Sequence, residues 1–188
     1  MEINTIHPSS WEKVVDVEFA EMDEEVGQIL KALRSGETLI APGVVMVDVD
    51  VAAVSFNGSH FPDLVAFDVR FKDCDFTGAS LEGLDVSGGE VRSCVFHSAN
   101  LVKAQFSHCF FAGVDFAGCH LDRAEFTDVA MTAVSFAQAS LVGATFDNCD
   151  LRGVDLGQAE LRETYFFGCQ IDARVATLAG VIVKEGLA

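Results

Sequence analysis

The sequence lacks long hydrophobic runs and is poor in positive charge. No apolar run approaches the ~18 residues of a membrane span, and the opening MEINTIHPSSWEK has no basic stretch leading into an apolar one. Only 12 Lys and Arg accompany 29 Asp and Glu, so the net charge is −17. Attachment to nucleic acid or anionic lipid through basic side chains is therefore disfavoured. We expect a cytoplasmic protein that binds neither membranes nor nucleic acid, with a basic protein surface as its natural partner.

Patterns typical of catalysis and of metal or cofactor binding are also scarce. The five His are scattered, the six Cys have no zinc-ligand spacing, and no Gly-rich loop connects a strand to a helix. No Ser, His and Asp set is expected to converge on a pocket. We predict a protein that is not an enzyme and that uses no cofactor or metal.

A period of five residues runs through most of the chain. Every fifth residue from Met46 to Ile171 is apolar, most often Phe or Leu, which explains 16 Phe beside one Tyr and one Trp. The residues two places earlier, from Val44 to Cys169, are small or aliphatic and never charged, and Gly recurs two places after the large residue. Both series are predicted to point inward. All six cysteines belong to the small series and are predicted to be core residues: Cys74, Cys94, Cys109, Cys119, Cys149 and Cys169.

A second period, of twenty residues, indicates how the units stack. A period of five is neither the 2 of a strand nor the 3.6 of a helix, so the chain must bend at each unit. Leu81, Leu101, Leu121, Leu141 and Leu161 are spaced by twenty, as are Phe106, Phe126, Phe146 and Phe166. Four units therefore form one coil, and about six coils at the ~4.8 Å spacing of paired strands give a rod roughly 30 Å long.

The segments FTGASL, HSANL, AGVDF, VGATF and LRGVDL resemble the pattern of the pentapeptide-repeat family. The resemblance covers about two thirds of the chain. It implies an all-β solenoid, namely a right-handed quadrilateral β-helix. The residues outside the repeat add a short N-terminal α-helical cap and a C-terminal apolar tail at its ends.

The three parts of the chain are predicted as a lead and capping helix over 1–45, a β-helix over 46–171 and a tail over 172–188. In DEEVGQILKALRSGE, Asp23 is placed to cap a helix that buries Val26, Ile29, Leu30 and Leu33. The apolar tail is predicted to form a homodimer; the alternative is that it folds back as a second lid. The predicted dimer residues are Tyr165, Phe167, Leu178, Val181, Ile182 and Val183.

Charge is predicted to differ between the four sides of the coil. Residues 46–171 carry 18 acidic and 7 basic side chains, a net charge of −11. One side has no Lys or Arg and forms the predicted acidic face: Asp48, Asp68, Asp85, Glu125, Asp128 and Asp147. The opposite side is a second acidic face: Asp75, Asp115 and Asp155. The alternative is that these charges only keep a solenoid soluble.

Within the family, the tail segment TLAGVIVKEG is similar to the C-terminal segment of the Qnr, MfpA and McbG type. That resemblance implies a non-catalytic DNA mimic that dimerises through its C-terminus. Such a protein binds the DNA-binding saddle of bacterial DNA gyrase or topoisomerase IV, and inhibits the enzyme or protects it from quinolones or toxins, a form of antibiotic resistance.

The lead VGQILKALRSGETL points to an alternative, because it is similar to that of cyanobacterial regulators such as HetL. This resemblance implies an interaction scaffold without topoisomerase activity. In that case, exposed apolar residues such as Val65, Phe67, Val95 and Phe110 are expected to form the partner site.

Overall fold

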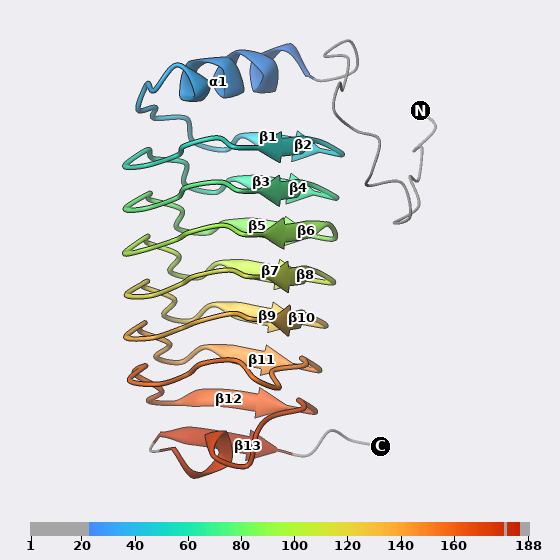
Figure 1. Cartoon of the computed structure of the whole chain (residues 1–188), viewed down its shortest axis with the longest axis vertical. Coiled ribbons are helices and arrows are strands. Elements are labelled where there is room, and N and C mark those ends of the chain that lie inside the picture. Colours follow the sequence, from blue (N-terminus) through green and yellow to red (C-terminus); the bar gives the residue numbers. More distant parts are fainter. Residues whose placement is uncertain (1–22, 179, 185–188) are drawn as a thin grey trace.

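The computed structural model, which describes residues 23–178 and 180–184, is a rod of stacked coils with a helix at its N-terminal end (Figure 1). Its helices are α1 (Glu24–Arg34) and the short 3-10 helix η2 (Val175–Thr177). Its strands are β1 (Val45–Val47), β2 (Asp50–Ala52), β3 (Val65–Phe67), β4 (Arg70–Lys72), β5 (Asp85–Ser87), β6 (Glu90–Arg92), β7 (Gln105–Ser107), β8 (Phe110–Ala112), β9 (Glu125–Thr127), β10 (Ala130–Thr132), β11 (Thr145–Asp147), β12 (Thr164–Phe167) and β13 (Val181–Lys184).

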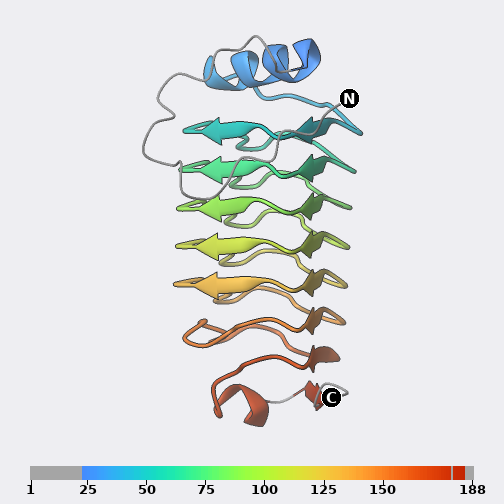
Figure 2. The same cartoon turned by 90° about the vertical axis from the view of Figure 1, so that its right-hand side faces the viewer.

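Parallel pairing between residues twenty positions apart holds the coils together. One side is an eight-stranded sheet of order β1-β3-β5-β7-β9-β11-β12-β13, and a second is a five-stranded sheet of order β10-β8-β6-β4-β2. Figure 2 shows each sheet as a column of short strands along the rod. Isolated bridges, such as Asp75↔Val95 and Ser80↔Asn100, join the coils on the other two sides. The predicted four-sided β-solenoid with twenty residues per coil is confirmed.

The interior consists of the two predicted inward series. Every large residue of the series from Met46 to Leu161 is buried, as is Phe166, whereas Ile171 is only half-buried because it lies at the end of the rod. Phenylalanines twenty residues apart stack ring on ring, as Phe126 and Phe146 do with centroids 4.6 Å apart and planes inclined by 4°. The like-on-like columns therefore fill the rod with apolar side chains.

A left-handed residue forms every corner of the coil. Each fifth residue from Gly43 to Gly168 has a positive φ, and most of these residues are not glycine; Asp48, Lys103 and Asn148 are examples. Positive φ is uncommon for residues other than glycine. The recurring Gly in the sequence therefore indicated only part of a feature that repeats at every unit.

Helix α1 covers the N-terminal end, as predicted (Figure 1). The Asp23 carboxylate accepts a hydrogen bond from the backbone N–H of Glu25 at 2.9 Å, which caps the helix. Val26, Leu30 and Leu33 are buried in the core. No helix in the described part of the chain is long and apolar enough to cross a bilayer.

The C-terminal segment folds back over the last coil. Val175 of η2 is buried, and β13 pairs in parallel with β12. The offset in this last pair is seventeen residues, with Thr164 opposite Val181, instead of the twenty of the other coils. The tail of a single chain thus folds back as a lid, which was the alternative to a dimer interface. Homodimerisation stays a prediction.

Candidate protein-binding face

The outer surface of the eight-stranded sheet has three columns of accessible residues. In a typical strand the central residue is buried and its two neighbours point outward. The corner residue that follows each strand adds the third column. Within strands β1 to β12 of this sheet, no outward or corner residue is Lys or Arg.

The six residues of the predicted acidic face all lie on this side, in two kinds of position. Asp85, Glu125 and Asp147 are outward residues of β5, β9 and β11. Asp48, Asp68 and Asp128 occupy left-handed corners after β1, β3 and β9. The structure therefore places the six side chains along one side of the rod, from its first to its sixth coil.

A basic residue of the neighbouring side reaches one end of this face. The Nη1 atom of Arg70, on β4, lies 3.9 Å from Oδ1 of Asp48, while its Nε donates to Asp50. The hydrogen bond to Asp50 raises the pKa of Arg70. Assigning charges to sides by position along the chain missed this contact, because a long Arg side chain can extend around a corner. Asp48 is thus partly neutralised.

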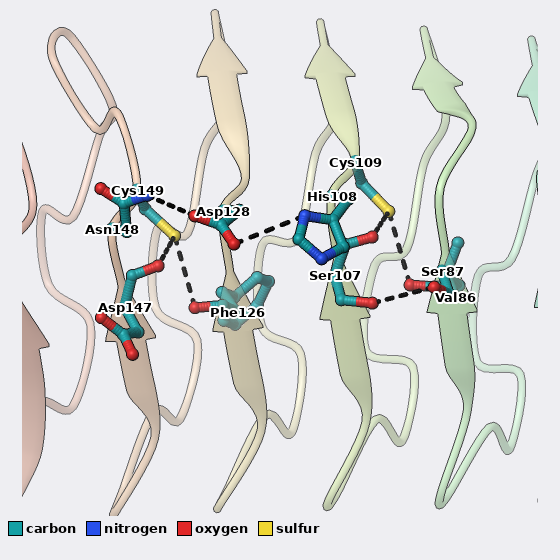
Figure 3. A network of polar contacts seen from close by, with 10 residues as sticks. All are labelled: Val86, Ser87, Ser107, His108, Cys109, Phe126, Asp128, Asp147, Asn148 and Cys149. Carbon is teal, nitrogen blue, oxygen red and sulfur yellow. Dashed lines mark hydrogen bonds and ion pairs between the residues drawn. The ribbon is translucent and has the colours of Figure 1, made fainter.

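The middle of the face is connected by side-chain contacts between coils (Figure 3). The amide of Asn148 donates to the carboxylate of Asp128, and Nδ1 of His108 lies 3.4 Å from the other oxygen of that carboxylate. Further along, the hydroxyls of Ser107 and Ser87 are hydrogen bonded at 3.1 Å. The contacts with Asn148 and His108 fix the position of the Asp128 carboxylate.

The second acidic face is a single column of residues in which every second coil carries an Asp. From Asp75 to Asp115 and from Asp115 to Asp155 the distance is two coils, or about 9.6 Å at the spacing of paired strands. Each carboxylate accepts a hydrogen bond from the backbone N–H two residues later, at 2.8–3.0 Å. His97 also lies 2.7 Å from Asp115. These carboxylates therefore stabilise turns in addition to carrying charge.

On the remaining two sides, several Lys and Arg side chains pair with neighbouring carboxylates. Arg152 donates from Nε to Asp150 at 2.8 Å, and this hydrogen bond holds the pKa of that carboxyl below its usual value. Lys103 lies 3.7 Å from Glu82. Arg92 pairs with Glu90 and lies over the ring of Phe110. The uncompensated charge of the rod is therefore greatest on the acidic face.

The cysteines are free thiols of the core, as predicted, with only Cys169 partly exposed. All but Cys94 have the sulfur close to a carbonyl oxygen of the preceding coil; the Cys119 Sγ, for example, donates to the Phe96 oxygen at 2.6 Å. Burial raises the pKa of Cys109 and of Cys119 to about 12. Among the described residues, no group of three His, Cys, Asp or Glu side chains could hold a metal ion.

The residues of the predicted dimer interface lie on two surfaces. Tyr165 and Phe167 stack on the outer face of β12, with ring centroids 5.9 Å apart, and Ile182 is opposite Tyr165 on β13. Val181 and Val183 alternate with Ile182 and so belong to the inner side of the sheet. Because β13 is the last strand, Val183 is nevertheless exposed at the end of the rod, as is Leu178.

Sequence reasoning missed an apolar cluster at the other end of the eight-stranded sheet. Val45 and Val47 are exposed on β1, next to Phe67 on β3. Of the four exposed apolar residues expected for an interaction scaffold, Phe67 is strongly exposed, whereas Val65, Val95 and Phe110 are half-buried. The signal was available in the outward positions of VVMVDV, where Val stands in place of a polar residue.

Comparisons with known proteins agree with this architecture. Residues 99–174 match the family model described as a pentapeptide repeat region. HetL, a pentapeptide repeat protein involved in heterocyst differentiation regulation in the cyanobacterium Nostoc sp. strain PCC 7120, is 16% identical with a TM-score of 0.62; the match covers 77% of this chain and 68% of HetL. No curated protein sequence matches the chain.

Two further solved structures are similar over much of the chain. One is a pentapeptide repeat protein of the Arabidopsis thaliana thylakoid lumen, 17% identical over 68% of this chain and 71% of that one, with a TM-score of 0.35. The other is QnrB1, a plasmid-mediated fluoroquinolone resistance protein, 18% identical over 74% of this chain and 93% of that one, with a TM-score of 0.26. The family-model match identifies residues 99–174 as a pentapeptide repeat region, and the likeness to HetL shows that the rod as a whole shares the fold of a pentapeptide repeat protein.

Proposed function

We propose that this protein is a non-catalytic binding rod whose acidic face binds a basic surface of a partner protein. The observation that supports the proposal is the charge of that face, where six carboxylates extend along the rod and no outward or corner residue of the eight-stranded sheet, from β1 to β12, is Lys or Arg. Such one-sided charge steers a partner of opposite charge and orients it.

The finer proposal is that the partner surface is one that otherwise binds DNA. Duplex DNA carries one negative charge per ~1.7 Å, or about 18 charges over the roughly 30 Å of six coils. The net charge of −11 over residues 46–171 is of the same order. The DNA-binding saddle of DNA gyrase or topoisomerase IV is the candidate, in accordance with the resemblance to the Qnr, MfpA and McbG type. Binding there would inhibit the enzyme or protect it from quinolones or toxins.

A gyrase supercoiling assay with the purified full-length chain, with and without a quinolone, tests this proposal. Asp85, Glu125 and Asp147 are replaced by Lys, because they lie on strands and their carboxylates form no ion pair within the described residues. The matched control replaces three acidic residues of other sides by Lys: Asp73, Glu160 and Glu163.

Both triple variants change the net charge equally, so a non-specific charge effect would appear in both. We expect the wild-type chain and the control to alter supercoiling or its inhibition by the drug, and the face variant to lose the effect. An equal effect of all three proteins, each with an unchanged melting temperature, would contradict mimicry.

The second candidate function is an interaction scaffold without topoisomerase activity. The exposed apolar residues Val45, Val47 and Phe67 favour it, since charge mimicry gives no role to apolar side chains. Under this function, replacing the three carboxylates leaves partner binding nearly unchanged, while replacing the apolar residues abolishes it.

A further inference from the structure

Four apolar side chains form a compact patch at the N-terminal end of the eight-stranded sheet. Val45 pairs in register with Val65, and Val47 with Phe67, so the four occupy neighbouring outward positions about 4.8 Å apart across the strands. Val45, Val47 and Phe67 are 54%, 60% and 51% exposed. We call Val45, Val47, Val65 and Phe67 the apolar patch.

The apolar patch differs from the rest of the same columns. The next four strands carry polar residues at both outward positions: Asp85, Gln105, Glu125 and Thr145 in one column, and Ser87, Ser107, Thr127 and Asp147 in the other. The inward side of the first two strands is already filled by Met46 and Ala66, which are fully buried. The four outward side chains are therefore not needed for the core, and a contiguous exposed group of this kind is typical of an interaction site.

Carboxylates border the apolar patch on two sides. Asp48 and Asp68 occupy the corners directly after β1 and β3. Asp85, on β5, lies in register with Val65 on β3. Arg70 reaches Asp48 at 3.9 Å, but Asp68 and Asp85 form no ion pair with any residue in the described ranges. An apolar surface with a negative border is complementary to a segment that carries both apolar and basic side chains.

The same charges disfavour the occupants that the chain itself could supply. Residues 1–22, which lie outside the described residues, contain five acidic side chains and one basic one. A second copy of the chain would bring a net charge of −17. Either would place like charges beside Asp68 and Asp85, which costs binding energy.

We propose that the apolar patch binds a basic amphipathic segment of a partner protein. The segment places apolar side chains over Val47 and Phe67 and Lys or Arg side chains beside Asp68 and Asp85. This inference rests on the proposed function in one respect only, namely that the partner is basic.

Two synthetic peptides of equal charge test the inference on the full-length chain. In one, Leu alternates with Lys, and in the other Ser alternates with Lys; their affinities are measured by titration calorimetry. We expect the Leu peptide to bind about ten-fold more tightly than the Ser peptide, the difference that ~1.4 kcal/mol of apolar contact produces. Equal affinities would overturn the proposal.

The double variant Val47→Ser, Phe67→Ser locates the preference. It should bind both peptides with similar affinity, because only the apolar contact is lost. The matched control Val95→Ser, Phe110→Ser changes the same kinds of residue on other sides and should keep the ten-fold preference. A preference that persists in the patch variant, or that is lost equally in the control, would show that the contact lies elsewhere. All the residues changed are at least partly exposed, and melting curves check that each variant folds.

The fluorescence of Trp11, the single tryptophan of the chain, tests whether residues 1–22 occupy the apolar patch. If the apolar patch is open to a partner, Phe67→Ser leaves the Trp11 emission maximum unchanged in the absence of peptide. A shift would indicate that residues 1–22 cover the patch and would overturn the proposal.

The Lys variants of Asp85, Glu125 and Asp147 separate this proposal from the proposed function. They should lower the affinity for both peptides and leave the ratio of the two affinities intact, whatever the gyrase assay shows.

Discussion

Phe116 and Phe136 stack ring on ring, with centroids 5.1 Å apart and planes inclined by 5°. Phe116 also stacks on Phe96 on its other side, and its side chain is completely buried. We expect Phe116→Ala to lower the free energy of unfolding by ~3–5 kcal/mol, because it removes a ring from the middle of a column. Chemical denaturation measures the change. Phe67→Ala, at an exposed position, is the control and should cost far less; similar losses would mean that the columns do not hold the rod together.

Gly89 lies close to the backbone of the preceding coil. Its φ is +80°, and a Cβ added there would meet the backbone oxygen and nitrogen of Val69. We expect Gly89→Ala to lower the melting temperature strongly, because the backbone of two coils would have to move apart. Gly58 has a similar φ of +63° but open space around it. Gly58→Ala should therefore cost only the roughly 1–2 kcal/mol of the left-handed conformation, and equal effects of both variants would argue against the close approach.

Alkaline pH should destabilise the rod through its buried thiols. Burial raises the pKa of Cys109 and Cys119 to about 12, against about 8.5 in an unfolded chain. Above pH ~8.5 the unfolded chain loses protons that the folded chain keeps, so stability is complete below that pH and is lost as the pH rises towards 12.

The double variant Cys109→Ala, Cys119→Ala should therefore lose less free energy of unfolding than the wild type between about pH 8.5 and 11. Alanine is already present in the Cys119 column at Ala99 and Ala139, so the fold should tolerate it. Denaturation curves at several pH values measure the difference, and parallel losses in both proteins would exclude Cys109 and Cys119 as its source.

The C-terminal end is proposed to associate with a second copy. Leu178 and Val183 are exposed there, and Ile182 extends the outer face that carries Tyr165 and Phe167. We expect sedimentation to show a dimer at micromolar concentration, and the variant Leu178→Ser, Val183→Ser to shift it towards monomer. A monomeric wild-type chain at that concentration would refute the prediction.

The interior was predictable because each inward position repeats. Phe126, for example, has Phe106 and Phe146 in register on either side, so the period of twenty alone placed it in a column. Helix α1 was predictable for a different reason, since Asp23 and the spacing of Val26, Leu30 and Leu33 are local signals.

Features that depend on side-chain reach or on the end of the repeat were not predictable. Arg70 contacts Asp48 across a corner. The period predicts on which side of the coil Arg70 lies, but not the direction in which its long side chain extends. β13 pairs with an offset of seventeen because it lies beyond Ile171, where the period of five ends. The exposure of Val45 depends likewise on its position in the first coil, where no preceding strand flanks β1 in the sheet.

The pairing of each coil with only the coils before and after it has a consequence for how such a molecule can change over time. A tandem duplication or deletion of twenty residues would alter the span by one layer, about 4.8 Å, while every side chain kept a neighbour of its own kind. Length is therefore a property that mutation can adjust in uniform steps, independently of the surfaces displayed along it, and a binding protein of this design can be matched to targets of different size.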